Sequence, residues 1–202
     1  MLKDVVLDLL RGSRSLRGTA SVPDPFAGQT RLHLGCGTNI LSGWANIDSS
    51  GQSEVVKWDL TQRLPVQPGT VQFIFNEHFI EHITRQQAVD LLYDCHRLLA
   101  PGGVLRISTP CLRKLIDEYL QGRTTEWIDV QWQPATACQM MNEGMRSWGH
   151  QFLYDTYELK SILRDCGFRE VAEVEWHQSR HPELRNLECR PFHDEIILEA
   201  TK

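Results

Sequence analysis

Short apolar runs that stop at turn residues recur through the first half of the chain. The clearest is RLHLG at residues 31–35, and similar runs follow at residues 45–48, 55–60, 71–76 and 104–109. Runs of this length, bounded by glycine, proline or polar residues, are typical of β-strands. We therefore expect five strands in this part of the chain.

Helical periodicity separates some of these strands. Thr84 and Gln87 form a capping-box pattern, and apolar residues then recur at helical spacing until Pro101 ends the helix. A second helix is expected over residues 112–120, and a third begins at Asp155 with another capping pattern. Strands that alternate with helices predict an α/β fold, with a mostly parallel sheet and helices on both of its faces.

Two more strands are expected near the end of the chain, at residues 171–176 and 195–200. Because no helical pattern separates them, they are expected to form an antiparallel pair at the end of the sheet. Residues 1–30 are predicted to form an N-terminal helix and a linker. Residues 31–202 are predicted to form one domain, with an insertion or lid at about 122–152.

Composition narrows the class of protein. The chain of 202 residues has a net charge of −5, which argues against nucleic-acid binding as its main role. The six cysteines form no Cys-x-x-Cys pair, so reduced thiols in the cytoplasm are expected. No apolar stretch approaches the length that spans a membrane, and the N-terminus lacks the pattern of a signal peptide.

Polar and glycine residues follow the predicted strands at the edge where such sheets bind ligands. Gly35 and Gly37 follow the first strand, and Asp48 ends the second. A dinucleotide-binding unit has a third glycine and an acid ~20 residues further on. Here Ile40 occupies the third position and Asp48 follows much sooner, so the pattern favours a nucleoside ligand without phosphate, such as S-adenosylmethionine.

Five segments taken in order resemble class I S-adenosylmethionine-dependent methyltransferases, most of all a small type-11-like bacterial branch. They are LHLGCGTN, GWANID, WDL, FIFNEHFIEHI and LLYDCHRLLAPGGVLRISTP, and the likeness resumes at GHQFLYDTYELKSILRDCGF and EIILEATK. The resemblance implies a Rossmann-like sheet of seven strands with the last one antiparallel. It also implies S-adenosylmethionine as cofactor and S-adenosylhomocysteine as product.

The resemblance implies roles for individual residues. Gly35, Cys36 and Gly37 would lie against the methionine part of the cofactor, with Asn39 in the shortened segment that follows. Asp48 would hold the ribose. The remaining contacts would be those of Asp59 and Leu60 with adenine, and of Asn76 with the methionine amino group.

Histidines supply the candidates for a general base. His78 and His150 are the candidates, and we expect at least one of them in the acceptor pocket, where it would take a proton from an acceptor hydroxyl. His78 also opens the string His-x-x-Glu-His, an inverted zinc-peptidase pattern. That pattern needs both histidines on one helix, but here it begins at the end of a strand, so no metal is expected.

Together with these residues, the resemblance implies a methyltransferase that acts on oxygen rather than nitrogen, on a hydroxyl group of a small molecule or glycan; the preference for oxygen and for a glycan is implied by the resemblance alone. The tryptophans and methionines of residues 122–152 would form either a wall for the acceptor or a small apolar core. Three alternatives remain open at this point: an inactive module that only binds the cofactor, an NAD-linked oxidoreductase, and a zinc hydrolase.

Overall fold

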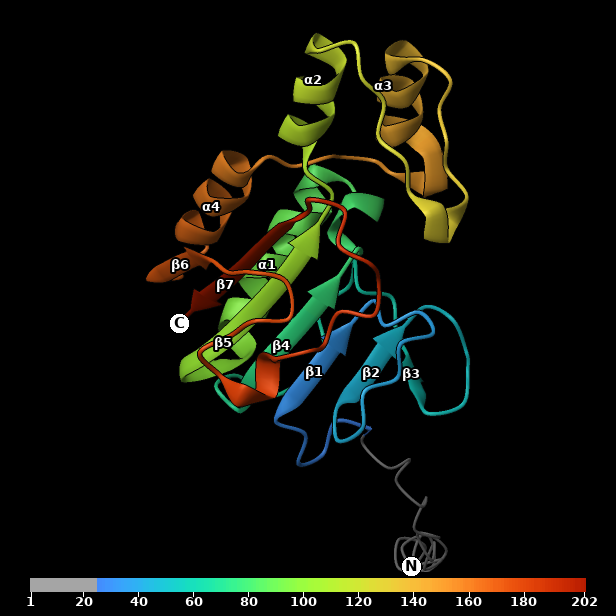
Figure 1. Cartoon of the computed structure of the whole chain (residues 1–202). Coiled ribbons are helices and arrows are strands. Elements are labelled where there is room, and N and C mark those ends of the chain that lie inside the picture. The colour runs from blue at the N-terminus through green and yellow to red at the C-terminus, as the bar shows by residue number, and fades with distance from the viewer. Residues whose placement is uncertain (1–24) are drawn as a thin grey trace, which may run out of the picture.

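The computed structural model of the chain describes residues 25–202 and contains a seven-stranded sheet (Figure 1). The strand order is β3-β2-β1-β4-β5-β7-β6, and β7 is the strand that runs antiparallel to its neighbours. The predicted Rossmann-like sheet, mostly parallel with an antiparallel last strand, is confirmed. The strands are β1 (Arg31–Leu34), β2 (Ala45–Asp48), β3 (Val55–Lys57), β4 (Val71–Glu77), β5 (Leu99–Thr109), β6 (Glu170–Glu173) and β7 (Ile196–Thr201).

Residues 25–202 contain four α-helices. They are α1 (Arg85–Leu98), α2 (Leu112–Leu120), α3 (Ala137–Arg146) and α4 (Thr156–Asp165). The predicted capping box begins α1, since the Thr84 hydroxyl accepts from the Gln87 N–H and the Gln87 side chain accepts from the Thr84 N–H. Asp155 caps α4 by accepting from the Glu158 N–H. Helices α2 and α3 stand side by side beyond the carboxyl ends of the strands (Figure 1).

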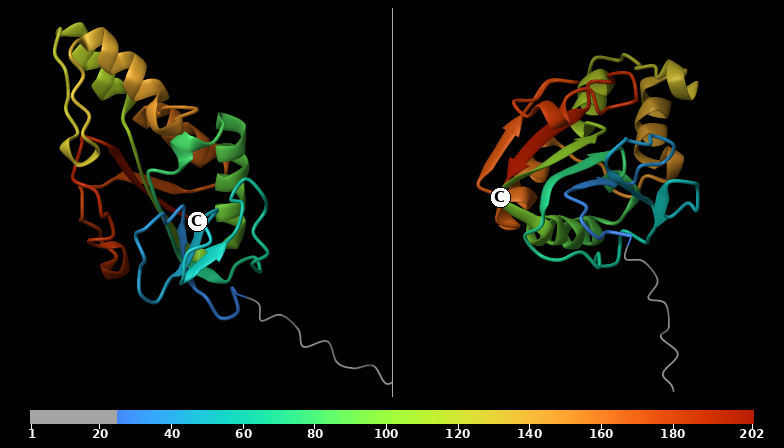
Figure 2. Two further views of the ribbon diagram at one scale, coloured as in Figure 1. Left: turned by 90° about the vertical axis from the view of Figure 1, so that its right-hand side faces the viewer. Right: turned by 90° about the horizontal axis from the view of Figure 1, so that it is seen from below.

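The two faces of the sheet are covered differently. Helices α1 and α4 pack against one face and form the main core with it. The other face carries segment 174–195, whose only helical turn is η4 (Pro182–Leu184) (Figure 2). The expectation of helices on both faces is therefore correct for one face only. The connection from β1 to β2 is too short for a helix that could cover the second face.

A buried ion cluster anchors segment 174–195 to the sheet. Arg106 on β5 is fully buried and donates to Glu188 at 2.6 Å and to Glu199 at 2.7 Å. It also donates to the Gln178 carbonyl at 2.7 Å. A buried guanidinium is tolerated only when its donors are paired, and here the segment supplies part of that pairing.

Smaller differences from the predicted elements have local causes. Strand β3 ends at Lys57, before the predicted end at residue 60, because its pairing partner β2 ends at Asp48, opposite Lys57. Strand β5 begins at Leu99, ahead of the Pro-Gly-Gly turn, through a pairing with Val71. The predicted N-terminal helix lies outside the described residues. No helix in the described part of the chain is long and apolar enough to cross a bilayer.

Candidate active site

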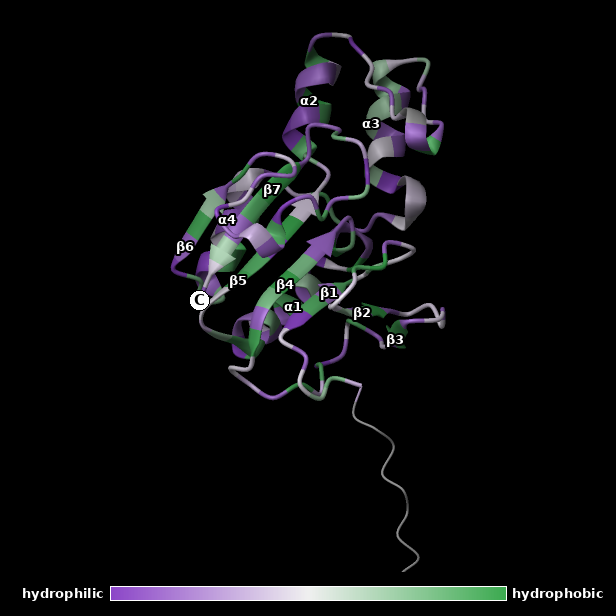
Figure 3. Ribbon diagram, turned by 60° about the horizontal axis from the view of Figure 1, so that its bottom comes forward, coloured by the Kyte–Doolittle hydropathy of each residue, from purple (hydrophilic) through white to green (hydrophobic). Residues whose placement is uncertain are grey.

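The carboxyl ends of β1, β2 and β4 border a cavity of about 280 Å³. The loop after β1 contributes Gly35, Cys36, Gly37 and Asn39 to its lining, and Asp48 contributes from the end of β2. Figure 3 shows the central strands largely hydrophobic, whereas the tip of β4 beside this cavity is hydrophilic. The structure thus brings together five of the residues predicted to bind the cofactor.

The first glycine of the loop is required by a close contact. Gly35 has φ of +69°, and a Cβ atom there would lie 2.5 Å from Cγ of Phe79. Gly37 also has a positive φ, and its N–H donates to Oδ2 of Asp48 at 3.0 Å. Only glycine adopts such backbone angles without strain, so both residues shape the loop.

Asp48 lies at the centre of the cavity edge as an ionised carboxylate. Its Oδ1 accepts from the Ser50 N–H at 2.8 Å, and its Oδ2 accepts from Gly37. Partial burial raises the pKa of Asp48, but these two backbone donors, together with the hydroxyls of Ser50 and Ser49, hold the pKa below its usual value. Asp48 is therefore charged at neutral pH and has lone pairs left for further donors.

A second hollow of about 450 Å³ adjoins the first, and Ser49 lines both. Trp58 and Asp59 line the second hollow from the segment after β3. The Asp59 carboxylate is exposed and accepts from the Thr61 N–H and hydroxyl. The Leu60 side chain is buried in the main core, so only its backbone is left for the predicted contact with adenine.

Glu77, at the end of β4, is a lining residue that the sequence analysis missed. Its carboxylate accepts from the N–H groups of Cys189 and Arg190 at 3.1–3.2 Å, which ties segment 174–195 to the cavity. Asn39 makes a second tie by donating to the Leu187 carbonyl. Asn76 lies deeper, and its Oδ1 is buried with no hydrogen-bond partner among residues 25–202.

His78 follows β4 with a positive φ of 46°, an unusual angle for a residue with a side chain. Its Nδ1 lies 3.2 Å from Oε1 of Glu81, and its Nε2 is buried with no hydrogen-bond partner in the described part of the chain. Glu81 is fully buried, which raises its pKa, but His78 and then His82 outweigh burial and lower the pKa overall. The carboxylate therefore orients the His78 ring.

A third hollow of about 120 Å³ lies beyond the first, and both are lined by His78, His82 and Arg190. His150 also lines it, so both predicted base candidates border the same space. The Nδ1 atom of His150 lies 3.0 Å from the Gly144 carbonyl oxygen. Burial lowers the pKa of His150 below its usual value, so the ring is neutral at pH 7.

The predicted insertion supplies one wall of the third hollow. Trp127 and Trp148 line it, with their ring centroids 5.4 Å apart in a stacked arrangement. Trp127 also belongs to a small core beneath, together with Trp132, Met140 and Leu115 of α2. The segment therefore serves both of the roles left open, and Trp127 takes part in each.

Comparison with solved structures identifies proteins that share this fold. No family model matches the chain, and no curated protein matches it. A solved S-adenosylmethionine-dependent methyltransferase from Archaeoglobus fulgidus is similar over 88% of each chain, with 19% identity and a TM-score of 0.53. Another from Mesorhizobium loti is similar over 87% of this chain and 91% of its own, with 15% identity and a TM-score of 0.51. The chain therefore has the fold of S-adenosylmethionine-dependent methyltransferases.

Proposed function

We propose that the chain is an S-adenosylmethionine-dependent methyltransferase that acts on a hydroxyl group of a small molecule or glycan. The observation that carries this proposal is the row of three adjoining hollows along the carboxyl edge of the sheet, with ionised Asp48 at its middle. The row offers separate places for a nucleoside, an amino-acid group and an acceptor, in that order.

The residues of the first two hollows suit the cofactor. Asp48 accepts from the ribose hydroxyls, because its Oδ2 accepts only the Gly37 N–H and keeps a lone pair. Its Oδ1 accepts from the Ser50 N–H and from the Ser49 hydroxyl, and a ribose hydroxyl takes the place of the longer Ser49 bond. Trp58 and Asp59 border the space for adenine. Glu77 is placed to pair with the methionine ammonium, and the Gly35–Gly37 loop follows the methionine chain.

S-adenosylmethionine supplies a methyl group on a positively charged sulfur, and transfer breaks this carbon–sulfur bond as the acceptor oxygen bonds to the carbon. His78 takes the proton of the acceptor hydroxyl on Nε2, which has no other partner among the described residues. Glu81 holds the opposite ring nitrogen and stabilises the imidazolium that forms. His150 contacts the acceptor from across the hollow.

The preference for oxygen and for a glycan rests on the resemblance to the type-11-like branch. Two features of the chain are compatible with it. Trp148 is exposed and stacks on the buried Trp127, so it offers a flat apolar ring to the acceptor space, which suits sugar rings as well as aromatic rings. The cytoplasm is part of the same proposal, and all six cysteines are free thiols.

Formation of S-adenosylhomocysteine in the presence of sugars, phenols and amines tests the proposal. A hydroxyl acceptor should raise its production above the rate without acceptor, and the His78→Gln variant should lose turnover more than cofactor affinity. Cofactor binding with no turnover on any acceptor would favour an inactive binding module. Transfer to amines alone would contradict the hydroxyl assignment.

A further inference from the structure

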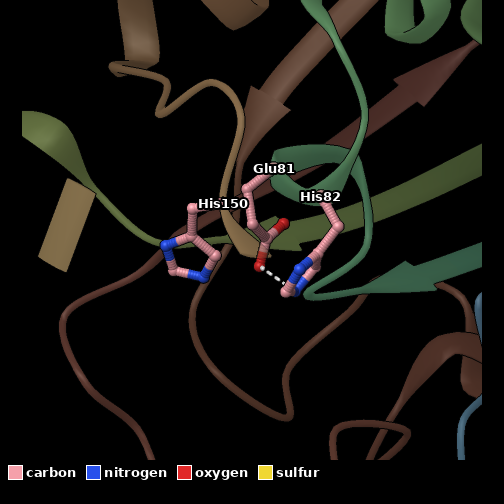
Figure 4. A group of neighbouring side chains, drawn as sticks. All are labelled: Glu81, His82 and His150. Atoms are coloured by element: carbon pink, nitrogen blue, oxygen red, sulfur yellow. Dashed lines mark ion pairs between the residues drawn. The ribbon is translucent and has the colours of Figure 1, made fainter. Parts of the chain in front are cut away.

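Three side chains with metal-binding atoms gather on the wall of the acceptor hollow. Glu81 and His82 belong to the short turn η1 (Ile80–His82), and His150 follows η3 (Ser147–Gly149). One carboxylate oxygen and one nitrogen from each ring all lie within 4.8 Å of one another. Figure 4 shows the three groups converging from two distant segments of the chain.

The side chains of Glu81 and His150 are each oriented by a hydrogen bond to the atom that points away from the cluster. The Thr109 hydroxyl donates to Oε2 of Glu81 at 3.0 Å, which leaves Oε1 on the side of the cluster. Nδ1 of His150 is paired with the Gly144 carbonyl, which makes Nδ1 the protonated nitrogen and leaves Nε2 with its lone pair. Metal-binding histidines and carboxylates are usually oriented in this way by a partner behind them.

The Glu81 carboxylate oxygen that faces the cluster, Oε1, has no hydrogen-bond partner in the described part of the chain. Oε1 of Glu81 is buried and makes no hydrogen bond among residues 25–202. It lies 3.2 Å from Nδ1 of His78 and 3.8 Å from Nε2 of His82, which are ion-pair distances only. A fully buried anion is costly unless it is paired with a charge or a metal ion.

We propose that Glu81, His82 and His150 bind a divalent transition-metal ion such as Zn²⁺ in the acceptor hollow. Two imidazoles and one carboxylate form a ligand set that such ions favour, and three protein ligands leave a coordination position open. Small side-chain shifts would bring the three atoms to bonding distance, and the partly exposed His82 side chain has solvent beside it for such a shift.

This site differs from the inverted zinc-peptidase pattern considered from the sequence. That pattern would use His78 and His82 on one helix, whereas the proposed set omits His78 and takes its third ligand from residue 150. His78 then remains beside the ligating carboxylate, with its Nδ1 at 3.2 Å from Oε1. The role of the ion rests on the proposed function: it would bind the acceptor oxygen and ease loss of the proton that His78 takes.

Titration of the full chain, free of any polyhistidine tag, with Co²⁺ tests the site, since the visible absorption of Co²⁺ reports its ligands. One Co²⁺ per chain should bind, and Zn²⁺ should displace it. The His82→Ala and His150→Ala variants should each weaken Co²⁺ binding by at least about tenfold. His181→Ala is the matched control, because His181 lies beside Phe73, outside the cluster, and should leave binding unchanged.

Circular dichroism of each variant shows whether it is folded, and titration with S-adenosylhomocysteine in parallel separates the two proposals. Absence of Co²⁺ binding would overturn the metal site, as would binding that both cluster variants leave unchanged. If Co²⁺ binds as expected and S-adenosylhomocysteine does not, the metal site stands and the proposed function fails. If only S-adenosylhomocysteine binds, the metal site fails and the methyltransferase proposal stands.

Discussion

Asp48 offers the sharpest test of how the chain holds its cofactor. Its two oxygens accept backbone N–H groups from Gly37 at 3.0 Å and from Ser50 at 2.8 Å. Oδ2 keeps one lone pair for a ribose hydroxyl, whereas Oδ1 also accepts from the Ser49 hydroxyl at 3.4 Å, a longer bond that a ribose hydroxyl can replace. Replacing Asp48 by alanine removes both acceptors and leaves the ribose hydroxyls unpaired in the site. Bonds to a charged acceptor are the stronger kind, so the expected loss of binding free energy is about 1–3 kcal/mol.

That loss corresponds to a roughly 5- to 150-fold increase in the dissociation constant for S-adenosylhomocysteine, measured by isothermal titration calorimetry. Asp48→Asn keeps one acceptor oxygen and should fall between the alanine variant and the natural chain. Asp90→Ala is the matched control, because Asp90 is an exposed carboxylate on α1. Unchanged affinity in Asp48→Ala would refute the ribose assignment, and an equal loss in Asp90→Ala would show that the effect is not specific.

Three further predictions concern stability, each measured by urea denaturation. Gly35→Ala should lower the free energy of unfolding by more than about 1 kcal/mol, because the added Cβ meets the Phe79 ring; a neutral effect would contradict the close contact. Burial lowers the pKa of His33 to about 4, so the natural chain should lose about 3 kcal/mol relative to His33→Gln as pH falls from 6.5 to 4; a constant difference would contradict this. Arg106→Met should cost about 3–5 kcal/mol, because two buried carboxylates lose their partner; a cost below about 1 kcal/mol would show that they are not held by Arg106.

Local patterns predicted the scaffold of the site well. The capping pairs at Thr84 and Asp155 begin their helices where the sequence indicates. The ends of β1 and β2 agree with the predicted runs, so the glycine loop and Asp48 could be placed at the sheet edge. These features depend on neighbours within a few residues, and sequence spacing is sufficient to describe them.

Contacts between distant segments could not be predicted in the same way. Glu77 meets the N–H groups of Cys189 and Arg190 because segment 174–195 crosses the face of the sheet, and no periodicity in that segment indicates its path. His150 reaches Glu81 only because η1 and the end of η3 lie together in the fold. The sequence identified His150 as a candidate base, but its proximity to Glu81 is a property of the tertiary structure.

Titration of the purified chain with S-adenosylhomocysteine, with NAD as the comparison ligand, tests the central claim most directly. The row of hollows around Asp48 predicts that S-adenosylhomocysteine binds with one site per chain and that NAD does not, because the loop after β1 lacks the helix that would hold a pyrophosphate. Binding of NAD in preference to S-adenosylhomocysteine, or no binding of either, would contradict the assignment of this edge as a site for S-adenosylmethionine.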